Sequence, residues 1–250
     1  AVKIAQALGF DEFNLNLGCP SARVQRGQFG ACLMRQGHEV AQSIRAMKDL
    51  ALLPITVKMR IGVDELDSYT FFSELAAQFI EAGVDKLIIH ARKAWLQGMN
   101  PKQNRTLPPL RYDYAYQLQA AFPQVPIILN GQLNDLLVMM AQREHVRGIM
   151  LGRLACANPY ALAKIHQRLY PKTPLLTRGE VVRSYLMRRH TAAAPLSMIY
   201  RPLLNMAHDL PHAKQWKKTL MVSAQQASRE NLLALAETYD SLFSTSQAHD

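Results

Sequence analysis

The chain has 250 residues, of which 49% are apolar, and this is enough to bury one sizeable core with a smaller appendage. Its three cysteines lack the paired spacing of disulfide scaffolds and zinc sites, and no apolar run approaches the ~18 residues of a membrane span, so the composition is typical of a cytoplasmic enzyme. The net charge is +10, and residues 151–250 carry 13 basic against 6 acidic side chains, which favours either a polyanion partner or a solvated helix surface.

The first predicted strand ends in a cysteine. Apolar residues alternate with Asn14 and Asn16 over 13–17, which is the period of a strand with one polar side. Gly18 and Pro20 then end the strand and leave Cys19 at its carboxyl end. Two amides and a thiol could hold a planar polar ring and protonate it. The alternative is a small buried cysteine beside a structural turn, and we expect Cys32 and Cys156 to be packing residues.

Four more short apolar runs end in polar residues. They cover residues 55–60, 86–92, 126–131 and 146–153, and they end in Lys-Met-Arg, His-Ala-Arg, Asn-Gly and Gly-Arg. Helical patterns over 40–51, 68–80, 113–122 and 134–143 separate the five runs. This alternation predicts parallel strands joined by helical crossovers, and therefore an α/β sheet or barrel. The polar ends would then meet at the carboxyl edge, where barrel enzymes hold their active sites.

The segment from Arg92 to Arg111 has little periodicity and is rich in proline and cations. Loops of this length in compact domains are usually functional or disordered. Since it follows a strand end, we interpret it as a lid over the site.

The last third of the chain is predicted to be helical. Two prolines in 170–174 mark a boundary, and Thr177 to Glu180 has the form of a capping box. We expect further helices over 195–208, 212–225 and 228–243. The predicted packing residues are Leu203, Leu204, Trp216, Leu220, Leu232, Leu235 and Leu242. The basic run at 214–218 is either a solvated face or a nucleic-acid contact.

Several ordered motifs resemble the tRNA-dihydrouridine synthases. They are GCPSARVQRGQFGACLM (18–34), TVKMRIGVD (56–64), IIHARKAWLQGMNPKQNRTLPPL (88–110), LNGQ (129–132) and LGRLACANP (151–159). The long loop resembles the bacterial A-type subgroup, which acts on the 20/20a uridines of the D loop. The resemblance runs over nearly the whole chain and is looser after residue 170.

The resemblance implies a flavin (β/α)₈ TIM barrel followed by an all-α helical bundle. By the resemblance the five strands correspond to strands four to eight, so we expect the chain, which starts at Ala1, to be an N-terminally truncated piece or a partial gene product; the alternative is a complete smaller fold. The expected domains are a catalytic, partial FMN-binding barrel over 1–170 and a helical tRNA-binding domain over 171–250. The implied protein is a cytoplasmic monomer when complete, with no metal and no membrane partner, and this fragment alone is expected to lose activity or stability.

The resemblance also assigns roles to individual residues. Cys19 would be the general acid that protonates C5 of uracil, while FMN, reduced by NADPH rather than NADH, supplies the hydride to C6. Asn16 would hold the uracil edge. The FMN contacts would be Lys58, His90, Asn130, Gly131, Gln132, Gly152 and Arg153, and the tRNA contacts Lys102, Arg105, Lys214 and Lys217. Arg60 and Arg92 could contact flavin or form ion pairs.

The sequence departs from the family pattern at two places and leaves alternative functions open. The family pattern reads Asn-Gly-Gly where this chain has Gln132, and a positive φ there would cost about 1–2 kcal/mol and weaken phosphate binding. Lysine replaces the arginine expected at 214 and 217, which loosens phosphate contacts. The alternative functions are another FMN-barrel reductase acting on a small pyrimidine or enone, and a non-catalytic RNA-binding remnant.

Overall fold

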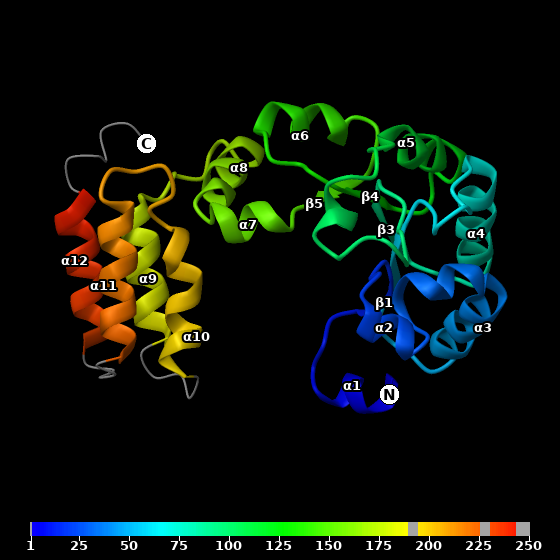
Figure 1. Ribbon diagram of the computed structural model, residues 1–250, viewed down its shortest axis with the longest axis horizontal. Coiled ribbons are helices and arrows are strands. Elements are labelled where there is room, and N and C mark those ends of the chain that lie inside the picture. The colour runs from blue at the N-terminus through cyan, green and yellow to red at the C-terminus, as the bar shows by residue number, and fades with distance from the viewer. Residues whose placement is uncertain (1, 190–194, 226–230, 244–250) are drawn as a thin grey trace. The chain divides into compact units, whose positions relative to one another are not determined.

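A computed structural model describes residues 2–189, 195–225 and 231–243, except the side chains of 224–225 and 231–233 (Figure 1). It divides into two compact units, Ala1–Leu151 and Gly152–Asp250. The division lies earlier than the predicted boundary after residue 170. The reason is that α7 (Arg153–Ala157) and α8 (Ala161–Leu169) pack with the helical unit. Asn205 Nδ2, for example, donates to the Cys156 carbonyl at 2.7 Å.

The first unit is built on a parallel sheet with strand order β1-β2-β3-β4-β5. The strands are β1 (Phe13–Leu17), β2 (Ile55–Arg60), β3 (Lys86–His90), β4 (Ile127–Asn130) and β5 (Gly148–Met150). Each strand pairs in parallel with the next one in the sequence. The five predicted strands and the α/β class are therefore confirmed.

The crossover helices cover the apolar face of the sheet. They are α3 (Gly37–Lys48), α4 (Tyr69–Glu81), α5 (Tyr112–Ala121) and α6 (Leu136–Arg143). In Figure 1, α3, α4 and α5 lie together on one side of the strands. The strand residues on this face are apolar in every strand because alternate side chains point to opposite faces. They include Leu17, Val57, Met59, Leu87, Ile89, Ile127 and Leu129, all of which are buried.

Local signals explain where these helices begin and end. Phe71 N donates to Ser68 Oγ at 3.1 Å at the start of α4, and Val138 N donates to Asp135 Oδ1 at 2.9 Å at the start of α6. Gly83, with φ +93°, follows α4 in the left-handed region that favours glycine. Shorter helical segments are α1 (Val2–Ala7), α2 (Ala22–Arg26), η1 (Gly30–Arg35) and η2 (Gln103–Arg105).

In the described residues of the second unit, all regular secondary structure is helical. After α8 come α9 (Arg178–Arg189), α10 (Leu196–Tyr200), η3 (Arg201–Asn205), α11 (Ala213–Gln225) and α12 (Asn231–Phe243). The capping box is confirmed, since Glu180 Oε2 accepts from Thr177 N at 2.7 Å and from Thr177 Oγ1 at 2.9 Å. The helix predicted over 195–208 is instead split, because Pro202 lies at the start of the tighter η3 turn.

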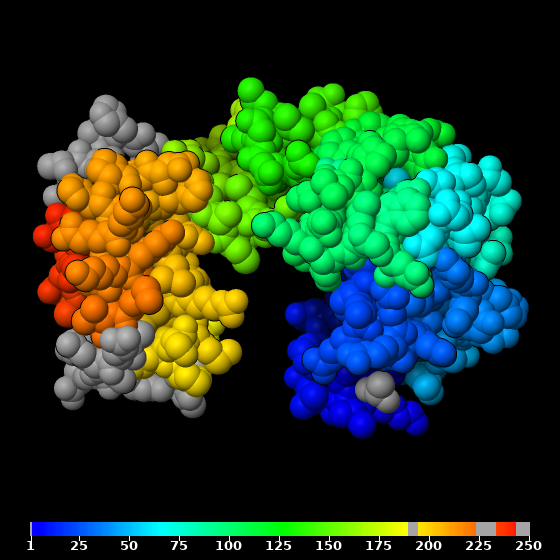
Figure 2. All heavy atoms as spheres, viewed as in Figure 1, coloured from blue at the N-terminus to red at the C-terminus, as the bar shows by residue number. Residues whose placement is uncertain are grey.

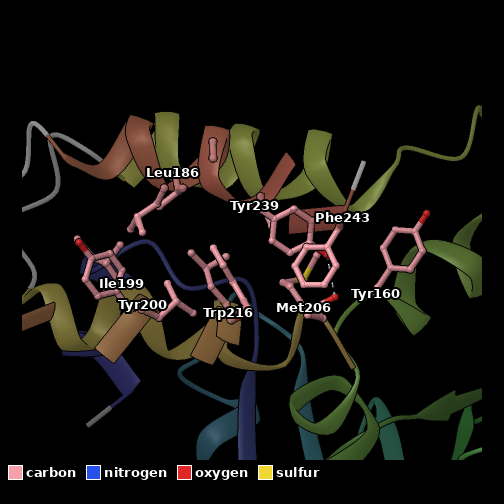
Figure 3. Packing of buried hydrophobic residues seen from close by; sticks show 14 residues of the cluster. Tyr160, Leu186, Ile199, Tyr200, Met206, Trp216, Tyr239 and Phe243 are labelled. Atoms are coloured by element: carbon pink, nitrogen blue, oxygen red, sulfur yellow. Dashed lines mark hydrogen bonds between the residues drawn. The ribbon is translucent and has the colours of Figure 1, made fainter. Parts of the chain in front are cut away.

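Aromatic residues fill the core of the second unit (Figure 3). The rings of Trp216 and Tyr239 meet edge to face at 4.9 Å, and Trp216 Nε1 donates to the Leu203 carbonyl at 2.9 Å. Of the predicted packing residues, Leu203, Trp216, Leu220 and Leu235 are buried, and Leu204 and Leu242 pack at the margin. The side chain of Leu232 lies outside the described residues.

Two cysteine predictions need correction. Cys156 is exposed rather than packed, and Cys32 is half-buried rather than fully in the core. Within the described part of the chain, no helix combines the length and apolar character needed to cross a membrane.

Candidate active site

The polar face of the sheet collects the side chains predicted for the site. Asn16 is in register with Lys58, Arg60 with His90, and His90 with Asn130. In-register residues of neighbouring parallel strands lie about 4.8 Å apart and point to the same face. The structure therefore brings these five residues together at the carboxyl end of the sheet, while their roles stay predictions.

Cys19 lies in a tight turn directly after β1. It is half-buried, with Sγ 3.4 Å from Ser21 Oγ, and its carbonyl accepts from Ala31 N at 3.0 Å. Gly30 closes the turn with φ +70°, and a Cβ there would lie 2.5 Å from the Cys19 carbonyl oxygen and 2.4 Å from Val24 Cγ1. Only glycine fits this close approach without movement of the backbone. The backbone at Cys19 is therefore packed against residues of α2 and η1.

The two asparagines of β1 have different partners. Asn14 Nδ2 donates to Thr56 Oγ1 at 2.8 Å, which makes it a cross-strand structural residue. Asn16 Oδ1 accepts from Gly18 N at 3.0 Å, and Asn16 is otherwise exposed. The Asn16 amide oxygen thus shapes the turn before Cys19. Its amide nitrogen is the group suited to donate to a carbonyl oxygen of a ligand.

Two cations follow one another on β2. Burial lowers the pKa of Lys58, and the neighbouring positive charge of Arg60 lowers that pKa further. Arg60 is 3% exposed, and burial lowers its pKa to about 10, with Arg105 and Arg92 adding repulsion and Cys19 opposing it. Lys58 is half-buried on the polar face, so an anionic group placed beside it would be attracted strongly.

Arg60 forms main-chain hydrogen bonds rather than the ion pair left open from the sequence. Its Nε donates to the Gly18 carbonyl at 3.0 Å, and its Nη1 donates to the carbonyls of Lys93 at 3.0 Å and Asn104 at 2.7 Å. The guanidinium therefore joins three segments of chain at the end of the sheet.

His90 and Gly131 make a close contact at the ends of β3 and β4. His90 is buried at 8% exposure, and Gly131 has φ +130°. A Cβ at Gly131 would lie 3.1 Å from both His90 Cδ2 and Leu110 Cδ2. Tyr112 Oη donates to the Gly131 carbonyl at 2.5 Å, so this backbone is fixed from the other side as well.

The residues on either side of Gly131 are also tied down. Asn130 Nδ2 donates to the Met150 carbonyl at 2.7 Å, which links β4 to β5. Gln132 has φ +50°, so this position adopts the left-handed conformation that the family's glycine would suit. Arg92 Nη2 donates to Gln132 Oε1 at 2.5 Å, and this bond offsets part of the strain.

The 92–111 loop is ordered around one buried amide. Asn104 is fully buried; its Oδ1 accepts from Trp95 N at 2.7 Å and its Nδ2 donates to the Trp95 carbonyl at 2.9 Å. Lys102 and Arg105 flank it and are exposed. In Figure 2 the green residues of this loop lie at the surface of the first unit, next to the blue residues around α2. The loop thus presents two cations to solvent from a fixed base.

The remaining predicted residues belong to the second unit. Gly152 and Arg153 are exposed at the start of α7, and Lys214 and Lys217 are exposed on α11 beside the buried Trp216. Their assignments to FMN and tRNA stay predictions.

Sequence reasoning missed two residues that organise the site. Gln25 Nε2 donates to the carbonyls of Pro20 at 2.8 Å and Leu96 at 2.6 Å, and Asn104 supports the loop as described above. Both lie inside the motifs quoted for the resemblance, so the motif was the available signal. Polar residue type alone did not separate them from exposed neighbours.

Comparison with known proteins identifies the family of this chain. The family model described as dihydrouridine synthase (Dus) matches residues 1–242. The chain belongs to the dihydrouridine synthase family. The match includes both the Cys19 turn and the polar strand ends, so these features belong to one family domain.

Curated relatives of the family are similar over most of the chain. A protein from Vibrio cholerae serotype O1 is 41% identical over 229 residues, covering 90% of this chain and 70% of the relative. One from Synechocystis sp. is 44% identical over 230 residues, covering 90% and 69%. One from Pasteurella multocida is 42% identical over 229 residues, covering 90% and 70%. All three are named tRNA-dihydrouridine(20/20a) synthase.

Proposed function

We propose that the protein reduces uridine 20 or 20a of the tRNA D loop to dihydrouridine in a flavin-dependent reaction. The observation that carries this proposal is the meeting of Cys19, Asn16, Lys58 and His90 at one end of a parallel sheet in a dihydrouridine synthase. The relatives' names suggest the uridine positions, and the proposal is supported by the thiol that follows β1 and the polar side chains at the neighbouring strand ends.

The winding of the sheet supports a segment of a (β/α)₈ barrel. Every strand lies next to its predecessor, so each crossover moves in the same direction, and the polar face stays free of the crossover helices. Doubly wound sheets reverse this order at a switch point. In a barrel the face away from the crossover helices points inward, and the carboxyl ends of the strands carry the chemistry. We assign the five strands to strands four to eight and the second unit to the tRNA-binding helical domain.

The residues at the strand ends fit a flavin mononucleotide. At Gly131 a Cβ would lie 3.1 Å from His90 Cδ2, so glycine lets the main chain after β4 pass close to His90 at the strand ends. Lys58 would supply positive charge for the reduced ring, and Asn130, Gly131 and Gln132 would hold the phosphate end. Gly152 and Arg153, in the second unit, keep the FMN assignment that the resemblance gives them. When bound, FMN reduced by NADPH supplies the hydride that uracil C6 accepts. Its pairing with NADPH rather than NADH rests on the resemblance.

The chain's own residues complete the reaction. The Asn16 amide donates to a uracil carbonyl and fixes the ring over the turn. The Cys19 thiol then donates its proton to C5, and the S–H bond breaks as the C5–H bond forms.

Exposed cations would place the tRNA. Lys102 and Arg105 extend from the loop beside the strand ends, and Lys214 and Lys217 extend from α11. Such cations attract the phosphate backbone and fix its register, while base selection falls to Asn16 and Cys19. In keeping with the family, we assign the complete protein to the cytoplasm as a monomer.

The decisive experiment compares two cysteines in the full-length protein. Cys19→Ala should lower the rate of dihydrouridine formation in unmodified tRNA by about 10²- to 10⁴-fold, because a positioned general acid contributes this much. Flavin reduction by NADPH should not change. Cys32→Ala, the matched control at another half-buried thiol, should keep its activity. A Cys19→Ala protein with most of its activity would contradict the assignment.

A further inference from the structure

Two side chains hold the Cys19 turn from opposite sides. Arg60 Nε donates to the carbonyl of Gly18, the residue before the cysteine, at 3.0 Å. Gln25 Nε2 donates to the carbonyl of Pro20, the residue after it, at 2.8 Å. The peptide carbonyls on both sides of the thiol are therefore anchored by side chains, and Ala31 N anchors the carbonyl of Cys19 itself.

The same two side chains also bind the 92–111 loop. Arg60 Nη1 donates to the carbonyls of Lys93 and Asn104, and Gln25 Nε2 donates to the Leu96 carbonyl at 2.6 Å. Each side chain thus connects one side of the cysteine turn to the loop. The connection needs donors only, because every partner is a main-chain oxygen.

The chemistry of the two residues suits this connection. A guanidinium presents several N–H groups in a fixed plane, so one arginine can serve three carbonyls without changing its shape. A carboxamide nitrogen carries two hydrogens, which matches the two carbonyls that Gln25 reaches. Burial strengthens both sets of bonds, since Arg60 is 3% exposed and Gln25 is half-buried.

We propose that Gln25 and Arg60 are positioning residues that fasten the Cys19 turn to the 92–111 loop, so that the thiol and the loop's exposed cations move as one body. The connection itself is a property of the fold. Its use, to fix the proton donor when a nucleic acid contacts Lys102 and Arg105, rests on the proposed function. Neither residue touches the reacting atoms in this scheme.

The first test measures access to the thiol without any enzymatic assay. Gln25→Leu keeps the side-chain size and removes both hydrogen bonds. The rate of Cys19 alkylation by iodoacetamide, followed by peptide mass spectrometry, should rise about fivefold, which corresponds to the loss of the one bond that holds the turn itself, to the Pro20 carbonyl, from an opening equilibrium. Cys156, exposed in the second unit, serves as the internal reference. Gln42→Leu is the matched control, because the exposed Gln42 side chain lies 2.9 Å from His38 Nε2 within its own helix, α3.

The second test measures the coupling by hydrogen exchange. In Gln25→Leu, amides of the loop at 92–104 should exchange faster together with those of the turn at 16–31. Arg60→Lys, which keeps the charge and loses the planar fork, should have the same paired effect. Arg147→Lys is its control, since Arg147 donates to the Pro123 carbonyl at 3.3 Å on an exposed surface. Faster exchange in the turn with an unchanged loop would overturn the proposal.

The activity of the same variants then tests the use of the connection. Gln25→Leu should lower kcat for dihydrouridine formation about fivefold, with flavin reduction by NADPH unchanged. Unchanged kcat with altered alkylation would refute the positioning role. Because alkylation and hydrogen exchange require no tRNA, they decide the structural connection even if the proposed reaction is wrong.

Discussion

Alanine and glycine at position 132 separate backbone strain from the hydrogen bond that Gln132 makes with Arg92. The backbone there has φ +50°, which costs a residue with a Cβ about 1 kcal/mol and costs glycine much less. The bond from Arg92 Nη2 to Gln132 Oε1 is charge-assisted, and both substitutions remove it. Gln132→Ala therefore loses the bond and keeps the strain, whereas Gln132→Gly loses the bond and relieves the strain.

The expected stabilities follow from these two contributions. Loss of the bond should cost about 1.5 kcal/mol, at the low end for a charged donor because Gln132 is exposed. We therefore expect Gln132→Ala to be less stable than the parent by about 1.5 kcal/mol, and Gln132→Gly by about 0.5 kcal/mol. Glycine is thus the better of the two residues at this position by about 1 kcal/mol.

A helical glutamine provides the control with the opposite sign. Gln117 is exposed within α5, where glycine should be worse than alanine by about 1 kcal/mol. Hydrogen exchange of peptides from β3 and β4 reports the unfolding free energy of the first unit without interference from the helical unit. The four variants should therefore give opposite alanine–glycine orders at the two sites.

The reasoning would be refuted if glycine were also the less stable residue at position 132. Such a result would mean that the backbone after Gly131 does not adopt the left-handed conformation. If the order is as expected, Gln132→Gly should also retain FMN more tightly, because the relaxed backbone can adjust its N–H groups to a phosphate.

Three further predictions test the site and its surroundings. Lys58→Met should weaken FMN retention in gel filtration. The apo protein should be as stable as the parent or more stable, because burial of the charged lysine costs free energy that methionine does not. Since its folded pKa lies below its unfolded value of 10.5, this advantage of methionine should be full at pH 7 and decline as the pH rises towards 10.5; an advantage that grew with pH would contradict the assignment. Gly30→Ala should destabilise the first unit by at least about 2 kcal/mol in urea unfolding, because the new Cβ would lie 2.5 Å from a main-chain oxygen. Wild-type stability of this variant would show that the turn opens easily. Replacing Lys214 and Lys217 by alanine should reduce the slope of log tRNA affinity against log salt by roughly two units, whereas Lys172→Ala on the same unit should not, and an unchanged slope in the double variant would exclude α11 as a docking surface.

The strands could be predicted because each is a short apolar run that ends abruptly. Ile55, Val57, Met59 and the run from Leu87 to Ile89 are buried in the structure, as their apolar character indicates. The last strand is shorter than the run suggests, since pairing begins at Gly148 rather than at residue 146. The sequence also predicted the second unit's helices, but it could not show that α7 and α8 pack with them. That division depends on long-range contacts such as the bond from Asn205 to residue 156.

The site was predicted where its residues follow strand ends, and it was incomplete where distant segments meet. Cys19, Lys58 and His90 lie at positions that the strand pattern fixes. The role of Arg60 could not be predicted, because its partners are main-chain carbonyls 33 to 44 residues away. The residue type at those positions does not indicate which carbonyl will accept a hydrogen bond. A carbonyl oxygen exists at every position, so only the folded path decides which ones an arginine reaches.

The strand order also has a consequence for folding during synthesis on the ribosome. Each strand pairs with the next one along the chain, at register offsets of 42, 30, 40 and 20 residues. Every pairing closes a loop of modest length, so its entropic cost differs little from one step to the next. Each new strand can therefore pair with the strand made just before it, as synthesis proceeds towards the C-terminus. By this route the polar edge is assembled from Asn16 towards Asn130 before the last helices have been translated.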